Sequence, residues 1–190
     1  MLRIIGGTWR GRKLRFPAES PIRPTPDRVR ETLFNWLAGK VQGARCLDLF
    51  AGSGALGLEA LSRGAAHVTF VERDPAAARE LRARLAEWQT PDAPVDARVE
   101  LMEARRYLSQ GVIQGPGNGI FDIVFLDPPF DSGLLQEALS LMQAHRRLAP
   151  GAWIYLEYPA KEGPPALPAG WARAKAKQAS EVGYDLWAVG

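Results

Sequence analysis

Apolar runs that alternate with stretches of helical periodicity are the strongest constraint in this sequence. Five such runs lie between residues 45 and 158, and most are joined to the next through a helical stretch, while a loop over 115–119 precedes the fourth. Strands that alternate with helices in this way form a mostly parallel sheet with helices on both faces. The runs that we expect to be strands are 45–51, 67–72, 98–102, 121–126 and 152–158.

The two ends of the chain depart from this alternation. Residues 171–177 and 184–189 predict an antiparallel pair at one edge of the sheet. Near the start, 2–5 and 13–16 predict a small hairpin, and Asp27 is an expected N-cap for a helix over 28–38. The fold class is therefore α/β, Rossmann-like, with one antiparallel strand near the C-terminal edge. We expect a basic N-terminal unit over 1–40 and a main domain over 41–190.

Capping signals mark several of the expected helices. Asp74 followed by Pro75 is typical of a helix start, and Gly64 of a helix end. Ser132 is the expected cap of the helix before the last parallel strand. These signals support the boundaries drawn from the apolar pattern.

Several classes of protein are excluded by composition. The 190 residues include one cysteine, Cys46, and two histidines, His67 and His145. These are too few for an internal disulfide, a zinc site or a histidine-dependent nucleophile. The sequence has no signal peptide pattern and no stretch of about 18 apolar residues. We therefore expect a cytoplasmic protein without a metal.

Positive charge is concentrated at the start of the chain. Residues 1–45 hold ten Lys and Arg against three Asp and Glu, whereas the remainder holds fourteen against eighteen. Such asymmetry is typical of a surface that contacts a polyanion, most simply a phosphate backbone. An arginine-rich, merely soluble surface would give the same count.

A glycine-rich turn follows the first strand. Asp48 ends the strand, and Gly52, Gly54 and Gly57 form a G-x-G-x-x-G pattern before a helix. This pattern fits a dinucleotide site, an S-adenosylmethionine site or a tight structural turn. Glu72, at the end of the second strand, can accept hydrogen bonds from two ribose hydroxyls. The glycine-rich turn and Glu72 together therefore favour a cofactor that contains a nucleoside.

The tetrapeptide Asp127-Pro128-Pro129-Phe130 follows the fourth strand at the same edge of the sheet. Proline lacks an N–H, so this turn offers acceptors: the Asp127 carboxylate and nearby carbonyls. Acceptors can hold an exocyclic amine of a nucleobase while its lone pair faces an electrophilic methyl. Phe130 offers a surface on which a base can stack. This turn favours methyl transfer over hydride transfer.

Four segments together resemble a known family. They are RIIGGTWRGRKL, RPTPDRVRETLFNWL, DLFAGSGALGLEALSRGA with VERD, and LDPPF. The chain resembles the bacterial 16S rRNA guanine-N2 methyltransferases of the RsmD type, which use S-adenosylmethionine. The resemblance implies a seven-stranded sheet and methylation of a guanine N2 amine of 16S rRNA. The substrate is expected within an assembled or assembling small subunit, and the enzyme is expected to be a monomer.

The resemblance and the motifs give three sets of candidate residues. The catalytic set is Asp127, Pro128, Pro129 and Phe130, around the target amine. The cofactor set is Arg23, Thr25, Asp48, Ala51, Gly52, Gly54, Glu72, Arg73, Glu103, Ala104 and Asp127, with Arg23 and Thr25 as a roof over the methionyl end. The RNA set is Arg10, Arg12, Lys13, Arg15, Arg28 and Arg30.

One position departs from the family pattern, and rival functions remain. Such enzymes commonly have an Asp near the adenine after the third strand, where this chain has Glu103. A DNA adenine-N6 methyltransferase shares the Asp-Pro-Pro-Phe turn but usually carries a separate recognition region. A nicotinamide dehydrogenase shares only the glycine turn. A non-catalytic RNA-binding relative would not need the complete tetrapeptide.

Overall fold

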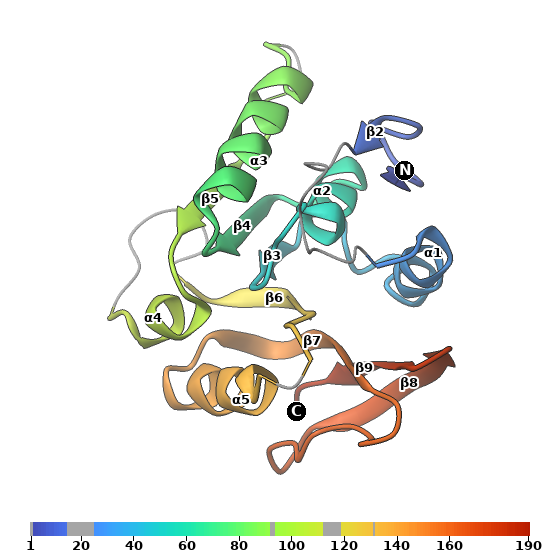
Figure 1. Cartoon of the computed structure of the whole chain (residues 1–190), viewed down its shortest axis with the longest axis vertical. Helices are drawn as coiled ribbons and strands as arrows, with labels where there is room; N and C mark the ends of the chain where they lie inside the picture. The colour runs from blue at the N-terminus through green and yellow to red at the C-terminus, as the bar shows by residue number, and fades with distance from the viewer. Residues whose placement is uncertain (1, 15–24, 92–93, 112–118, 131) are drawn as a thin grey trace.

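A computed structural model describes residues 2–14, 25–91, 94–111, 119–130 and 132–190. It has three layers, with a central sheet between two layers of helices (Figure 1). The segment 15–24 lies outside the described residues, and so the predictions for Arg15 and Arg23 do too.

The central sheet has seven strands in the order β5-β4-β3-β6-β7-β9-β8. Strands β3 to β7 are parallel, and β9 runs antiparallel to both β7 and β8, which confirms the expected mixed edge. The strands are β3 (Arg45–Asp48), β4 (His67–Glu72), β5 (Ala97–Leu101), β6 (Phe121–Leu126), β7 (Leu148–Pro159), β8 (Ala172–Ala179) and β9 (Val182–Ala188). The order reverses between β3 and β6, which creates a topological switch point.

Helices lie on opposite faces of the sheet (Figure 1). Two apolar clusters attach them to it. One face is covered by α1 (Asp27–Trp36), α2 (Ala55–Ser62) and α3 (Pro75–Trp88). The other is covered by α4 (Ala104–Ser109) and α5 (Leu134–Ala144). Alternate residues of each strand supply the two cores: Cys46 and Phe125 face the first, Leu47 and Val124 the second.

The expected helix boundaries are partly confirmed. The Asp74 carboxylate accepts hydrogen bonds from the N–H groups of Ala76 and Ala77, and Pro75 opens α3. Gly64 follows the α2 C-cap with a positive φ of 91°. The short helix α4 was not predicted, because it contains too few turns for a helical period to be visible. The expected cap Ser132 was wrong by one residue, since Gly133 takes the N-cap position of α5.

The N-terminal hairpin, β1 (Leu2–Arg3) and β2 (Lys13–Leu14), packs against α2. Its backbone is held by the buried Glu59 carboxylate, which accepts hydrogen bonds from the N–H groups of Ile5 and Gly6, both at 2.8 Å. Nearby, Ser62 Oγ accepts from the Trp9 N–H at 2.9 Å. The hairpin thus shares a core with the main sheet, and the proposed division at residue 40 stays a prediction.

Arg30 connects the hairpin, α1 and α2. Its Nη2 lies 2.6 Å from Asp27 and donates to the Arg3 carbonyl, while Nη1 lies 3.5 Å from Glu59. The Arg30 side chain has no exposed surface. Two expectations were therefore wrong. Asp27 was expected to be the N-cap, but the N-cap is Pro26, and Asp27 is the first helical residue and pairs with Arg30. Arg30 was expected to contact RNA, but its buried side chain cannot do so.

No helix of the described segments is long and apolar enough to cross a membrane.

Replacing Arg30 tests whether this buried cluster holds the N-terminal unit. We expect Arg30→Ala to lower the free energy of unfolding by about 3–5 kcal/mol, because Glu59 would lose a buried cation. Arg28 is exposed on the same helix, so Arg28→Ala is a matched control with an expected effect below about 0.5 kcal/mol. Urea denaturation measures the free energy of unfolding of both variants. Equal losses of stability would contradict a special role of the buried Arg30.

Candidate active site

The glycine-rich turn joins β3 to α2 by close backbone packing. Asp48 Oδ2 accepts a hydrogen bond from the Gly57 N–H at 2.9 Å, which ties the strand end to the first turn of α2. Gly54 is the N-cap and has a φ of 75°. A Cβ on Gly54 would lie 2.6 Å from Leu81, and one on Gly57 would lie 2.2 Å from Phe70. Glycine lets the turn lie close to α3 at Gly54 and lets α2 lie close to the sheet at Gly57.

Glu72 links the ends of β3 and β4. Its Oε2 accepts from the Gly52 N–H at 2.6 Å, and its Oε1 accepts from the Asp74 N–H at 2.7 Å. The residue remains partly exposed, and each carboxylate oxygen keeps a further lone pair. Glu72 is therefore oriented by backbone donors and still able to accept from a ligand hydroxyl.

The remaining predicted cofactor residues lie along the same edge. Ala51 is buried, and its N–H donates to Val71 at 3.0 Å, whereas Arg73 is exposed after β4. Glu103 is exposed at the N-cap of α4, and Ala104 is buried behind it. Glu103 thus lies at the carboxyl end of β5, the neighbour of β4 in the sheet.

The Asp127 turn lies at the carboxyl end of β6, next to β3. Asp48 pairs with Phe125 in the parallel register, so Asp127 follows just beyond the level of Asp48. Thr25 Oγ1 lies 3.0 Å from Asp127 Oδ2 and brings the segment before α1 to the turn. Pro128 is buried, Pro129 is exposed, and Phe130 keeps 39% of its surface exposed.

Burial raises the pKa values of Asp48 and Asp127. Burial raises the pKa of Asp48 to about 7, and the negative charges of Asp127 and Glu72 act in the same direction. The Gly57 N–H opposes this shift by stabilising the carboxylate. Burial also raises the pKa of Asp127, against the hydrogen bond from Thr25. A ligand that carries positive charge would relieve this repulsion.

Known proteins are similar to this chain over nearly its whole length. The family model described as Conserved hypothetical protein 95 matches residues 2–188. The chain is 48% identical over 186 residues to Ribosomal RNA small subunit methyltransferase D of Escherichia coli strain K12, covering 98% of this chain and 89% of that protein. The chain belongs to the RsmD-type methyltransferase family.

One further relative and two solved structures are also similar to this chain over nearly its whole length. The Haemophilus influenzae Ribosomal RNA small subunit methyltransferase D is 44% identical, with 98% of this chain and 93% of that protein covered. The solved structure of yhhF from Escherichia coli has a TM-score of 0.86 at 46% identity, covering 99% of this chain and 97% of that one. The crystal structure of HI0767 from Haemophilus influenzae has a TM-score of 0.80 at 42% identity, with 98% and 97% covered.

The predicted RNA residues of this RsmD-type chain occupy different environments. Arg10, Lys13 and Arg28 are exposed. Arg12 is half-buried, with its guanidinium 5.4 Å from the Trp88 ring and Nη1 donating to the Trp88 carbonyl at 3.3 Å. Arg30 is buried, as described above. The candidate surface is therefore reduced to the exposed members and Arg12.

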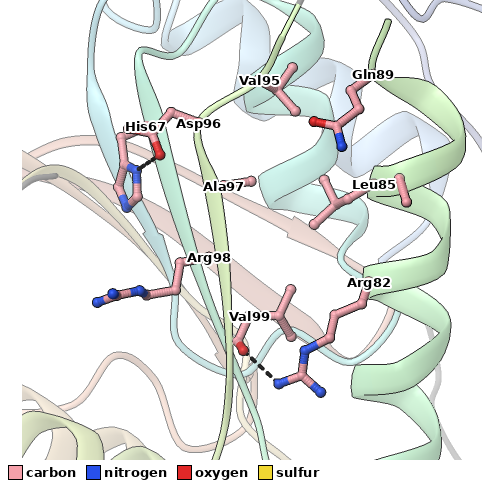
Figure 2. Close-up of a pocket in the computed structure, with 10 residues that line it drawn as sticks. His67, Arg82, Leu85, Gln89, Val95, Asp96, Ala97, Arg98 and Val99 are labelled. Atoms are coloured by element: carbon pink, nitrogen blue, oxygen red, sulfur yellow. Dashed lines mark hydrogen bonds and ion pairs between the residues drawn. The ribbon is translucent and has the colours of Figure 1, made fainter. Parts of the chain in front are cut away.

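A groove of about 500 Å³ lies away from the predicted site. Figure 2 shows that it runs between β5 and α3, where Arg82 donates to the Val99 carbonyl at 2.7 Å. His67 and Asp96, 3.0 Å apart, lie at the amino ends of the strands. The glycine turn and Asp127 lie at the carboxyl ends, so this groove contributes nothing to the candidate site.

Sequence reasoning missed Glu157, which lies within the apolar run of β7. Its Oε1 lies 3.1 Å from Thr25 Oγ1 and 2.7 Å from Tyr155 Oη. The signal was present in the sequence, because a carboxylate inside an otherwise apolar strand must find buried partners.

The pH dependence of stability tests the electrostatics of this edge. Between its ordinary pKa of 3.8 and about 7, Asp48 keeps a proton in the folded chain and loses it in the unfolded chain. The Asp48 contribution to the free energy of unfolding should therefore fall, by about 1–3 kcal/mol, as pH rises through this window.

Chemical denaturation of the wild type and Asp48→Asn at several pH values measures this contribution. We expect the wild type to lose stability relative to Asp48→Asn as pH rises and the difference to level off above about pH 7. The exposed substitution Glu162→Gln is the control and should show no such window. A difference between wild type and Asp48→Asn that does not change with pH would contradict the account.

Proposed function

We propose that this chain transfers a methyl group from S-adenosylmethionine to the N2 amine of a guanine in the rRNA of the small ribosomal subunit. The observation that carries the proposal is the position of Asp127. It follows β6 at the switch point beside Asp48, is tied to Thr25 and is followed by the exposed ring of Phe130. The rRNA substrate is supported by the names of the relatives and by the exposed basic residues of the hairpin.

The residues at the carboxyl edge fit S-adenosylmethionine. Glu72 would accept from the ribose hydroxyls, and the turn over Asp48, Gly52 and Gly54 would enclose the methionyl part. Burial is the main cause of the raised pKa of Asp48, and the negative charges of Asp127 and Glu72 add to it. These neighbouring carboxylates suit a ligand with a sulfonium and an ammonium group. Bound S-adenosylmethionine would supply an activated, electrophilic methyl group.

The protein contributes position and hydrogen-bond acceptors. The Asp127 carboxylate and the prolyl turn carbonyls would accept the two N–H groups of the guanine amine, which directs its lone pair at the methyl. Phe130 would stack on a base taken out of its helix. Most of the rate gain would come from holding the amine and the methyl in line at about 3–3.5 Å.

Products from radiolabelled S-adenosylmethionine test the proposal. Unmodified small subunits, free 16S rRNA and duplex DNA are incubated in parallel and digested to nucleosides. We expect N2-methylguanosine from ribosomal material and none from DNA. N6-methyladenine from DNA would instead support the alternative of a DNA methyltransferase, and cofactor binding without any product would support the non-catalytic RNA-binding alternative.

Replacing Asp127 separates chemistry from cofactor binding. We expect Asp127→Ala to lower the transfer rate by about 100-fold or more, because the amine loses its charged acceptor. The dissociation constant for S-adenosylmethionine should stay within about twofold, as Asp48 and Glu72 remain in place. Single-turnover kinetics and calorimetry measure the two quantities, and a normal rate would refute the role of Asp127.

Charge reversal on the hairpin tests the RNA surface. We expect Arg10→Glu to weaken RNA binding and to reduce the slope of log affinity against log salt by about one. Lys161→Glu makes the same charge change at another exposed site and is the control. Equal effects of the two variants would contradict a local contact, and loss of cofactor affinity would place the hairpin in the cofactor site.

A further inference from the structure

A buried chain of oxygen atoms extends from the catalytic turn into the sheet. Thr25 Oγ1 lies 3.0 Å from Asp127 Oδ2 and 3.1 Å from Glu157 Oε1. Glu157 Oε1 also lies 2.7 Å from Tyr155 Oη. Thr25 and Glu157 each keep 5% of their surface exposed, and Tyr155 keeps none. Water therefore cannot readily satisfy Thr25, Glu157 and Tyr155, whereas Asp127 is half-buried. The protons of the three buried groups decide their hydrogen bonds.

The strand register makes this arrangement a property of the sheet. Leu126 of β6 pairs with Leu156 of β7 in the parallel ladder, so Asp127 and Glu157 are the next residues along neighbouring strands. The two carboxyl groups face Thr25 from one side of the sheet. Thr25, two residues before α1, supplies the hydroxyl that lies between them.

Counting protons shows that two ionised carboxylates do not fit here. The Thr25 hydroxyl carries one proton but has a carboxyl oxygen at hydrogen-bond distance on each side. Tyr155 supplies a second proton, directed at Glu157. With both carboxyls ionised, one contact of Thr25 would bring two lone pairs together. A third proton on one of the two carboxyls gives every contact a donor. Glu157 is the more deeply buried of the two, with 5% of its surface exposed, whereas Asp127 is half-buried at the end of β6. The proton is therefore placed on Glu157, so that Tyr155 donates to Glu157, Glu157 to Thr25 and Thr25 to Asp127.

We propose that Glu157 is a positioning residue that stays protonated and, through Thr25, holds Asp127 ionised and oriented toward the target amine. This inference rests on the proposed function. Thr25 occupies one oxygen of Asp127 and leaves the other oxygen available as an acceptor. Glu157 acts through Thr25 and does not touch the substrate.

The surroundings of Glu157 favour its neutral form. Burial raises the pKa of Glu157, and the negative charge of Asp127 raises it further, against the hydrogen bonds from Tyr155 and Thr25. Among the described residues, the titratable groups that face Glu157 are Asp127 after β6, Tyr155 on its own strand and Tyr184, its cross-strand partner on β9. The hydroxyl of Thr25 faces it from the segment before α1.

The proposed transfer also needs an ionised Asp127 for its proton balance. The amine nitrogen forms a bond to the methyl carbon while the carbon–sulfur bond breaks and its electron pair goes to sulfur. The nitrogen must then lose one proton, and an ionised Asp127 can accept it before it passes to solvent. A proton already held on Glu157 leaves Asp127 free for this step.

The pH profile of single-turnover methyl transfer to small subunits, at saturating S-adenosylmethionine, tests the proposal. The wild-type rate should fall on the alkaline side, where Glu157 ionises and competes with Asp127 for the Thr25 proton. Glu157→Gln should keep the rate within about threefold, because its amide N–H can donate to Thr25 as the protonated carboxyl does, and its profile should lack the alkaline fall. Glu157→Ala should lose about tenfold or more in rate with little change in cofactor affinity.

Two controls separate positioning from folding. The exposed Glu162→Gln should keep the wild-type profile. Thermal unfolding of each variant identifies loss of fold, and Glu157→Gln keeps the test valid if Glu157→Ala does not fold. The proposal is overturned if Glu157→Gln retains the alkaline fall of the wild type, or if it loses as much rate as Glu157→Ala.

Infrared spectroscopy of the full chain tests the protonation of Glu157 without any activity. The difference spectrum between the wild type and Glu157→Gln should show a protonated carboxyl band at neutral pH that disappears at alkaline pH, while the band from Asp48 is common to both proteins and cancels. A spectrum unchanged by Glu157→Gln would refute the proposal even if the enzyme is active. If wild type transfers no methyl group but the band is present, the proposed function fails and the protonation of Glu157 stands.

Discussion

The parallel pairing of β3 with β6 is the constraint on which the candidate site depends. The sheet continues from β3 to β4 and β5 on one side and from β6 to β7 on the other, so strand order reverses at this pair. Parallel strands bring their carboxyl ends to one edge, and the crevice at the reversal is not covered by a crossover helix. Asp48 and Asp127, far apart in the chain, therefore meet at one place.

The N-terminal segment completes the site from outside the sheet. Glu59, buried in α2, holds the hairpin backbone and lies near Arg30, which in turn fixes the start of α1. Because Thr25 directly precedes this helix start, the same cluster places its hydroxyl between Asp127 and Glu157. The N-terminal unit thus contains a buried arginine that holds the start of α1, together with the exposed basic residues that we propose contact RNA.

Much of the fold could be predicted because its signals are local. Apolar runs and caps such as Asp74 and Gly64 depend on neighbouring residues, and the bounds of β4 and β6 were predicted as the structure has them. The role of Arg30 could not be predicted, since a charged residue on a helix is usually exposed and only the tertiary fold brings Glu59 beside it. Glu157 was missed because one of its partners, Thr25, is 132 residues away in the chain, and only the fold brings the two together.

The central claim is that one edge of the sheet holds both the methyl donor and the target amine. A crystal structure of the chain with S-adenosylhomocysteine tests it most directly. The account predicts the ribose hydroxyls at Glu72, the amino acid part at the turn between Asp48 and Gly54, and the sulfur directed toward Asp127. Density for the ligand in the groove between β5 and α3, or with its sulfur directed away from Asp127, would contradict the account.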